Sequence, residues 1–183
     1  MTMAANILAI ETSLGAASAA VARDGKVVAE ARGGAAFRTA EELPALLESV
    51  MKAAGLAWAD LGMIAATVGP GSFTGIRTGL ATARGLALAL NIPARGYLTF
   101  DVARWSAGLE PSVPIALSNW KGGYYASDGL RIAEDDELAA GTHIAAAAEI
   151  DAGGLARLAA SGAAFLLPEP VYIAQPSVSV KCA

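Results

Sequence analysis

The stretch from Met63 to Leu90 places an apolar segment, a glycine-rich turn and an alanine-rich segment directly next to one another. Residues 63–68 predict a buried strand, because they form a short, mostly apolar run that ends at glycine. Residues 75–90 predict a helix that is closed by Asn91 and Pro93. A buried strand that leads through a tight turn into a helix is typical of mixed α/β proteins. We therefore expect the chain to fold around this strand–turn–helix unit.

The turn between the strand and the helix, GPGSFTG, looks like a phosphate-binding loop but lacks the required parts. A Walker loop places Lys and Ser or Thr directly after its last glycine, whereas Ile76 and Arg77 follow Gly75. In the dinucleotide-binding fingerprint the third glycine would fall at Thr74. Neither of these nucleotide-binding motifs is therefore complete.

Small residues recur every four positions along the predicted helix, at Gly75, Gly79 and Ala83. They lie on one side of the helix, where they let another part of a backbone approach closely. Two alternatives follow for this small-residue side. It packs against the sheet of the same chain, or it receives a helix of a partner.

The composition indicates a globular protein without a membrane-spanning segment. The 183 residues are 55% hydrophobic, enough to bury one larger core or two small ones, and no apolar run reaches the length of a span. No basic residue precedes the first apolar run, which argues against a signal peptide, and the single Cys182 cannot form an internal disulfide. We therefore expect a cytoplasmic location. The net charge of −4 disfavours a broad surface for nucleic acid.

Other parts of the chain predict further strands and helices. Apolar periodicity from Glu41 to Ala54 predicts an amphipathic helix that Gly55 ends. The turn residues Asp24 and Gly25 predict a hairpin. Residues 139–164 are rich in alanine and glycine and have only weak periodicity. The remaining predictions are strands over 7–10, 17–22, 26–31, 113–117, 124–126 and 165–167 and a helix over 100–107.

Three segments resemble the TsaB (YeaZ) family: residues 7–13 (ILAIETS), 69–90 and 170–176 (PVYIAQP). The resemblance runs over most of residues 6–108 and returns in patches to the end, and the glycine turn with its helix is the most specific part. It implies an α/β protein with the actin-like ATPase (ASKHA, ribonuclease H-like) fold, in which helices flank a mixed sheet. The second half looks shortened. We expect an N-terminal actin-like α/β domain over residues 1–100 and a shortened C-terminal α/β domain over 101–183.

The resemblance also implies a function. Members of this family act as non-catalytic scaffold partners of TsaD in forming N6-threonylcarbamoyladenosine in tRNA, and they dimerise through helices of the N-terminal domain. A homodimer is expected when TsaD is absent. This chain would contact a TsaE-type ATPase and tRNA only as part of the complex. ATP and Mg²⁺ would bind elsewhere in the complex and are not required by this chain.

The resemblance assigns two groups of site residues. The interface candidates on the predicted helix are Phe73, Gly75, Ile76, Gly79, Leu80 and Ala83. Glu11, Thr12 and Ser13 are the nucleotide-binding candidates, because the actin-like fold places an acidic residue near Mg²⁺ at the end of its first strand. The alternative for this second group is structural: Glu11 caps a turn, and Thr12 and Ser13 satisfy backbone groups.

No catalytic residue and no metal site are expected. A zinc hydrolase needs about three protein ligands, and His143 is the one histidine of the chain. It is expected to be a surface or capping residue, so the glycoprotease label given to related proteins is not supported. Thr39 stands where the family commonly has His, the hairpin 118–125 (SNWKGGYY) lacks two acidic positions, and Ala174 replaces a usual Arg. A stand-alone actin-like ATPase or small-molecule kinase remains the alternative function.

Overall fold

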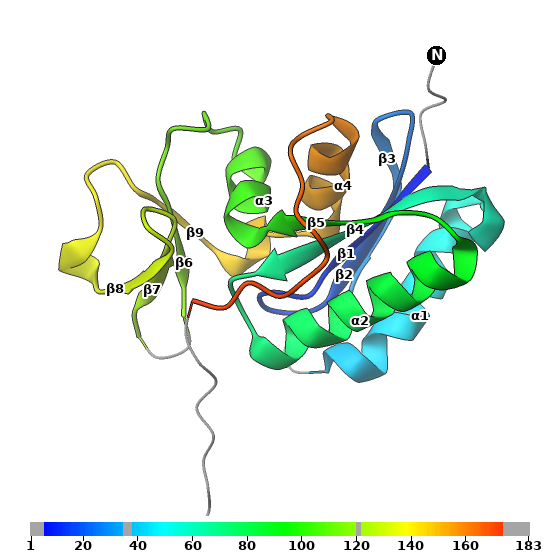
Figure 1. Ribbon diagram of the computed structural model, residues 1–183, viewed down its shortest axis with the longest axis horizontal. Helices are drawn as coiled ribbons and strands as arrows, with labels where there is room; N and C mark the ends of the chain where they lie inside the picture. Colours follow the sequence, from blue (N-terminus) through cyan, green and yellow to red (C-terminus); the bar gives the residue numbers. More distant parts are fainter. Residues whose placement is uncertain (1–5, 35–37, 120–121, 174–183) are drawn as a thin grey trace, which may run out of the picture.

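The computed structural model describes residues 6–34, 38–119 and 122–173 (Figure 1). Its larger sheet has the order β3-β2-β1-β4-β5. The strands β1, β2 and β3 are antiparallel neighbours, and β4 and β5 continue the sheet parallel to β1. The bounds of these strands are β1 Asn6–Glu11, β2 Ser18–Arg23, β3 Lys26–Arg32, β4 Leu61–Gly69 and β5 Ala94–Leu98.

Helices cover both faces of this sheet (Figure 1). The helices α1 (Thr39–Ala54) and α2 (Phe73–Leu90) lie side by side on one face, and α3 (Thr99–Ser106) and α4 (Ala152–Ala160) cover the other. Side chains of α1 and α2 form a buried apolar cluster with the facing residues of β1, β2 and β4. A second cluster joins the opposite sheet face to α3 and α4. The mixed α/β class expected from the strand–turn–helix unit is confirmed.

A smaller sheet follows in the chain, with the order β8-β7-β6-β9 and strands of three or four residues. Ile115 and Leu117 of this sheet belong to the same buried cluster as Ile7 and Ala9 of β1 and Leu155 of α4. The two sheets therefore share one apolar core, and α3 contacts strands of both sheets. The strands are β6 Ile115–Ser118, β7 Tyr124–Ala126, β8 Arg131–Ala133 and β9 His143–Ala145.

Most elements with a clear periodicity were predicted correctly to within two residues. The hairpin around Asp24 is confirmed, and both turn residues have positive φ, 53° at Asp24 and 77° at Gly25, as a two-residue hairpin turn requires. Helix α1 ends at Gly55 with a left-handed φ of 64°. Helix α2 begins at Phe73, because the side chain of Ser72 caps its first turn.

The elements without strong periodicity were missed or misjudged. Strand β5 was not predicted, because its sequence, ARGYL, carries Arg and Gly at a sheet edge. The weakly periodic segment contains β9 and α4, and β8 precedes it. The strand predicted over 165–167 is wrong in extent: only Leu166 forms a bridge, with Gly96. The predictions for Cys182 and Ala174, and part of the hairpin at Trp120 and Lys121, lie outside the described residues.

None of the helices in the described part of the chain combines the length and apolar character that a membrane span requires.

Candidate functional site

The glycine turn lies directly on the end of strand β1. The backbone N–H of Ser72 donates to the carbonyl oxygen of Ser13 over 2.6 Å. A Cβ atom at Gly71 would overlap that same carbonyl group, so only glycine permits this approach. The Ser72 hydroxyl accepts from the N–H of Gly75 over 3.1 Å and caps helix α2. The turn thus serves to seat α2 on β1.

The small residues of α2 face the interior of their own chain. A side chain at Gly75 would overlap the carbonyl oxygen of Thr12, and one at Gly79 would overlap its hydroxyl. Ala83 is fully buried. The alternative of internal packing is therefore correct for this side of the helix, and the expectation that it receives a partner helix is corrected.

Two further interface candidates, Ile76 and Leu80, are buried as well, at 0% and 3% exposure. Both belong to the cluster beneath α1 and α2. The physical reason is the helical period: Ile76 and Leu80 lie next to Gly75 and Gly79 on the side that the sheet covers. Neither can contact a second chain in this conformation.

Phe73, the remaining interface candidate, is partly buried by the C-terminal part of the chain. Its ring centroid lies 5.2 Å from that of Tyr172, and the guanidinium carbon of Arg77 lies 3.8 Å from the Phe73 centroid. Arg77 Nε also donates to the Tyr172 hydroxyl over 2.8 Å. The backbone N–H of Val171 donates to the carbonyl oxygen of Val68 over 2.7 Å. This segment therefore covers the turn and the first turn of α2.

The outer side of α2 carries exposed residues that the sequence analysis did not assign to the interface. Leu88 is 85% exposed, Ala81 is exposed, and a Cβ atom at Gly85 would meet open space. Their spacing of three and four residues places them on one side of the helix, opposite the stripe of Gly75 and Gly79. The periodicity that revealed the small-residue side could have identified this exposed side too.

Glu11 lies at the end of β1 with a completely buried carboxyl group. Its Oε1 accepts hydrogen bonds from the Ser13 backbone N–H over 2.6 Å, from the Ser13 hydroxyl, and from the Thr67 hydroxyl over 3.4 Å. Among the described residues Oε2 has no hydrogen-bond partner. Desolvation raises the Glu11 pKa to about 7, and the Ser13 hydrogen bonds and the positive charge of Arg32 oppose this rise.

The three nucleotide-binding candidates are brought together, but none of them faces solvent. Thr12 and Ser13 are buried at 4% and 0% exposure beneath the glycine turn and α2. The backbone N–H of Ser13 donates to Oε1 of Glu11, and the Ser13 carbonyl oxygen accepts from the N–H of Ser72. These hydrogen bonds hold the glycine turn in place. The arrangement agrees with the structural alternative given for these residues. Direct contact between the Glu11 carboxyl group and a phosphate or Mg²⁺ would require the turn to move.

His143 lies in strand β9 of the smaller sheet, paired with Ile115 of β6. Its Nε2 is 3.0 Å from Oε2 of Glu149, and this interaction lowers the pKa of Glu149. Within the described ranges no three His, Cys, Asp or Glu side chains converge as metal ligands would. His143 is a partly exposed residue with a local carboxylate partner, as expected.

Comparison with known proteins places the chain in a family. Residues 28–180 match the family model described as TsaD: tRNA N6-adenosine threonylcarbamoyltransferase. The chain is 38% identical over 93 residues to the Escherichia coli tRNA threonylcarbamoyladenosine biosynthesis protein TsaB, which covers 51% of this chain and 40% of that protein. It is 30% identical over 174 residues to an uncharacterised protein of Mycobacterium bovis, covering 88% of this chain and 76% of the relative.

Solved structures agree with the fold. A Pseudomonas aeruginosa structure described as an uncharacterised protein with similarity to peptidase YEAZ superposes with a TM-score of 0.77 at 20% identity, covering 93% of this chain and all of that one. The chain therefore shares the fold of that protein, a mixed sheet with helices on both faces, as expected for the α/β class. The match to the E. coli relative spans less than half of that protein's length. With the family model matching most of its length, the chain belongs to the TsaD-related proteins and, within them, to the TsaB (YeaZ) family.

Proposed function

We propose that this chain is a non-catalytic subunit that supports the formation of N6-threonylcarbamoyladenosine in tRNA. Its membership in the TsaB (YeaZ) family carries the proposal, because the matched E. coli relative is named for biosynthesis of this nucleoside. A TsaD protein is the proposed partner and supplies the chemistry. The complex works in the cytoplasm, where a TsaE-type ATPase, ATP and Mg²⁺ join it.

The proposed contact with TsaD is the exposed side of α2 beside α1. Leu88 offers an almost fully exposed apolar side chain, and Gly85 and Ala81 leave room for a partner helix to approach. This choice replaces the buried side of α2, whose small residues contact Thr12. The same exposed side would pair two copies of this chain when TsaD is absent.

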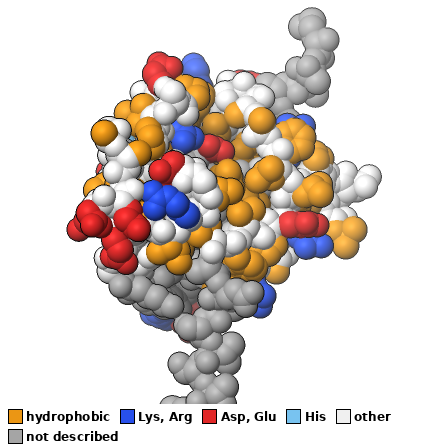
Figure 2. Space-filling model, turned by 60° about the vertical axis from the view of Figure 1, so that its left-hand side comes forward, with side chains coloured by type: hydrophobic (Ala, Val, Ile, Leu, Met, Phe, Trp, Pro, Cys, Tyr) orange, Lys and Arg blue, Asp and Glu red, His pale blue; other side chains and the backbone are white. Residues whose placement is uncertain are grey.

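Contact with tRNA is proposed to occur through the complex. In Figure 2 acidic side chains gather at one edge of the face shown, and basic side chains lie scattered among hydrophobic ones. The chain as a whole carries a net charge of −4. Binding to nucleic acid depends strongly on Lys and Arg side chains that neutralise phosphates. The negative net charge of this chain therefore supports the proposal that a partner supplies the basic surface that binds tRNA.

Co-purification with the TsaD protein of the same cell tests this function. Leu88→Glu places a charge on the most exposed apolar side chain of the proposed contact, and we expect at least about a tenfold loss of affinity, as for the loss of one dominant contact residue. The matched control is Ile144→Glu on strand β9, where the side chain is 49% exposed, and this variant should bind normally. Normal binding by Leu88→Glu would remove α2 from the interface.

The alternative is a stand-alone actin-like ATPase or small-molecule kinase, and it makes a different prediction. The purified chain alone would then hydrolyse ATP with Mg²⁺, and Glu11→Ala would abolish the turnover. Because the Glu11 carboxyl group is fully buried, we expect no turnover above the background of the assay. Sustained hydrolysis that depends on Glu11 would overturn the assignment as a non-catalytic subunit.

A further inference from the structure

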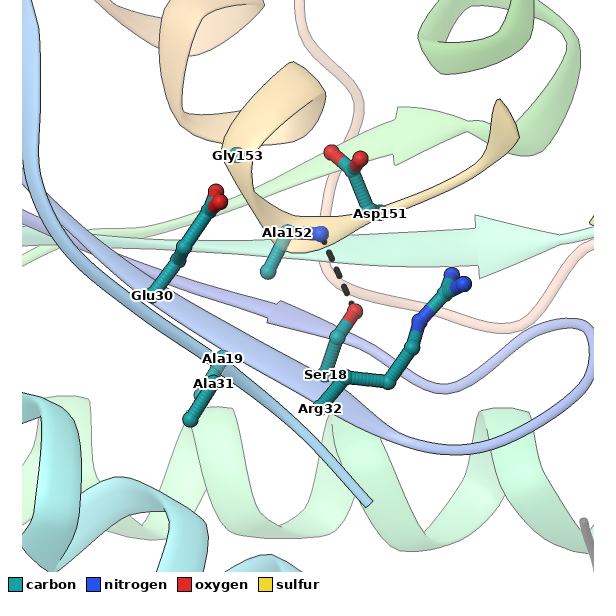
Figure 3. A pocket seen from close by; sticks show the side chains of 8 residues that line it. All are labelled: Ser18, Ala19, Glu30, Ala31, Arg32, Asp151, Ala152 and Gly153. Carbon is teal, nitrogen blue, oxygen red and sulfur yellow. Dashed lines mark hydrogen bonds between the residues drawn. The ribbon is translucent and has the colours of Figure 1, made fainter. Parts of the chain in front are cut away.

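A cavity of about 290 Å³ opens between strands β2 and β3 and the start of helix α4 (Figure 3). Ser18 forms its floor, and the Ser18 hydroxyl accepts from the backbone N–H of Ala152 over 3.0 Å. Because α4 covers the face of the sheet opposite α1 and α2, the cavity lies away from the proposed TsaD contact (Figure 1). The lining residues are Ser18, Ala19, Glu30, Ala31, Arg32, Asp151, Ala152 and Gly153.

One end of the cavity is positively charged. Arg32 projects from β3, and its Nη2 donates to the carbonyl oxygens of Ile150 over 2.7 Å and Ala147 over 3.4 Å, which fixes the guanidinium group at the loop before α4. No carboxylate among the described residues forms an ion pair with Arg32. Nε and Nη1 of this guanidinium have no acceptor among the described residues, so their N–H groups are available for charge-assisted hydrogen bonds to a carboxylate ligand.

The other end is negatively charged. A Cβ atom at Gly153 would lie 2.5 Å from Oε2 of Glu30 and 3.3 Å from Oδ1 of Asp151, so both carboxylates lie close to the backbone of Gly153 at the start of α4. Asp151 also accepts from the N–H of Gly154 over 2.6 Å, which fixes its position. Arg157 Nη1 lies 3.4 Å from the same point but forms no ion pair with either carboxylate among the described residues. Two carboxylates that line the same cavity attract a compact cation such as an ammonium group.

We propose that this cavity binds a small zwitterion of the amino-acid class, with its carboxylate on Arg32 and its ammonium group between Glu30 and Asp151. The volume lies near the lower limit for ligand pockets and suits an amino acid, whereas a nucleotide needs more space. Two charged ends of opposite sign in one cavity select a ligand that carries both charges, because a ligand with one charge leaves the other end unpaired. This proposal is independent of the proposed function.

A titration of the ¹⁵N-labelled chain with L-serine, followed by amide chemical shifts, tests the proposal. The comparison ligands are 3-hydroxypropionate and ethanolamine, each of which carries one of the two charges. We expect saturable shifts at the amides of residues 152–154 with L-serine, with a Kd on the order of 1 mM. Each comparison ligand should bind at least about tenfold more weakly, as expected for the loss of one charge-assisted contact.

Two variants connect the binding to the cavity. Glu30→Gln keeps the shape of an exposed side chain and should weaken L-serine binding by about tenfold. The matched control, Glu48→Gln on the exposed side of α1, should bind like the unchanged chain. Arg32→Ala should abolish binding; if loss of its contact to Ile150 unfolds the chain, as circular dichroism would show, Glu30→Gln decides.

Three results would overturn the proposal. These are the absence of saturable shifts with L-serine, equal binding of one of the singly charged ligands, and unchanged affinity of the Glu30→Gln variant.

Discussion

At the scale of single residues, the most unusual group among the described residues is the buried carboxyl group of Glu11, because its pKa is raised to about 7. It is completely covered, its Oε1 accepts from Ser13 and Thr67, and its pKa is raised to about 7 mainly by desolvation. Burial of a carboxylic acid favours the neutral form. The group is therefore half-protonated near neutral pH in the folded chain, whereas the unfolded chain ionises it at about 4.5.

This difference in pKa predicts a loss of stability as pH rises. The contribution of Glu11 is fully present below about pH 4.5, falls as pH rises toward about 7, and stays lost above that value. One pKa unit corresponds to about 1.4 kcal/mol, so the loss is on the order of 3 kcal/mol. The free energy of unfolding by urea between pH 4.5 and 8 measures it.

The variant Glu11→Gln isolates this effect, because its side chain cannot ionise. The unchanged chain should lose stability as Glu11 ionises, whereas the variant should not. The free energy of unfolding of the variant minus that of the unchanged chain should therefore increase from pH 4.5 to 7. Glu48→Gln, at an exposed position of α1, provides the control and should follow the unchanged chain. If the free energy of unfolding depends on pH in the same way in the Glu11→Gln variant and in the unchanged chain, the pKa of Glu11 is not raised.

Among the elements, α2 has two sides with opposite demands on side-chain size. On the inner side Gly79 contacts Thr12 so closely that a Cβ atom would overlap its hydroxyl. On the outer side Gly85 has nothing within 4 Å of the same position. Glycine at position 79 therefore allows close packing, whereas glycine at position 85 only lowers the helix propensity of α2.

We predict opposite effects of alanine at these two glycines. Gly79→Ala should destabilise the chain by about 1–3 kcal/mol, because Thr12 and α2 must move apart. Gly85→Ala should stabilise it by about 0.5–1 kcal/mol through helix propensity. Urea unfolding at fixed pH compares the two variants.

A second substitution tests the stated contact. Thr12→Ala removes the overlapping hydroxyl, which has no hydrogen-bond partner among the described residues. The double variant Thr12→Ala, Gly79→Ala should therefore recover most of the stability lost in Gly79→Ala alone. Strict additivity of the two changes would show that Gly79 is small for another reason.

In the whole molecule, one apolar core joins the two sheets, and both α3 and α4 contribute side chains to it. Leu155 is fully buried in a cluster that contains Ile7 of the first sheet and Ile115 of the second. The expected division into residues 1–100 and 101–183 stays a prediction. A shared core nevertheless predicts that both parts lose their structure together.

We therefore predict that Leu155→Ala destabilises both parts of the chain. The loss should be about 2–5 kcal/mol, the range for deleting a buried leucine side chain. Hydrogen exchange at Ala9 of β1 and Ala116 of β6 should rise by a similar factor. The control Leu167→Ala removes a side chain that is 71% exposed and should change little. Faster exchange at β6 alone would mean that the two parts unfold independently.

Much of the fold could be predicted from local patterns. The helix from Glu41, the hairpin at Asp24 and the unit from Met63 to Leu90 have strong periodicity or turn chemistry, and the structure contains all three. Strand β5 and helix α4 could not be predicted well, because their stability comes from neighbours that lie far away in the sequence. The cavity below α4 was missed for the same reason: Arg32 and Asp151 meet only in space.

The sequence by itself determined that small residues line one side of α2, because the spacing of Gly75, Gly79 and Ala83 is a property of the helix alone. It could not determine what that side touches. Only the tertiary structure decided that Thr12, directly after β1, fills the space beside Gly75 and Gly79. The reason is physical: periodicity defines which residues share a side, whereas contacts depend on how distant segments are brought together by the sheet.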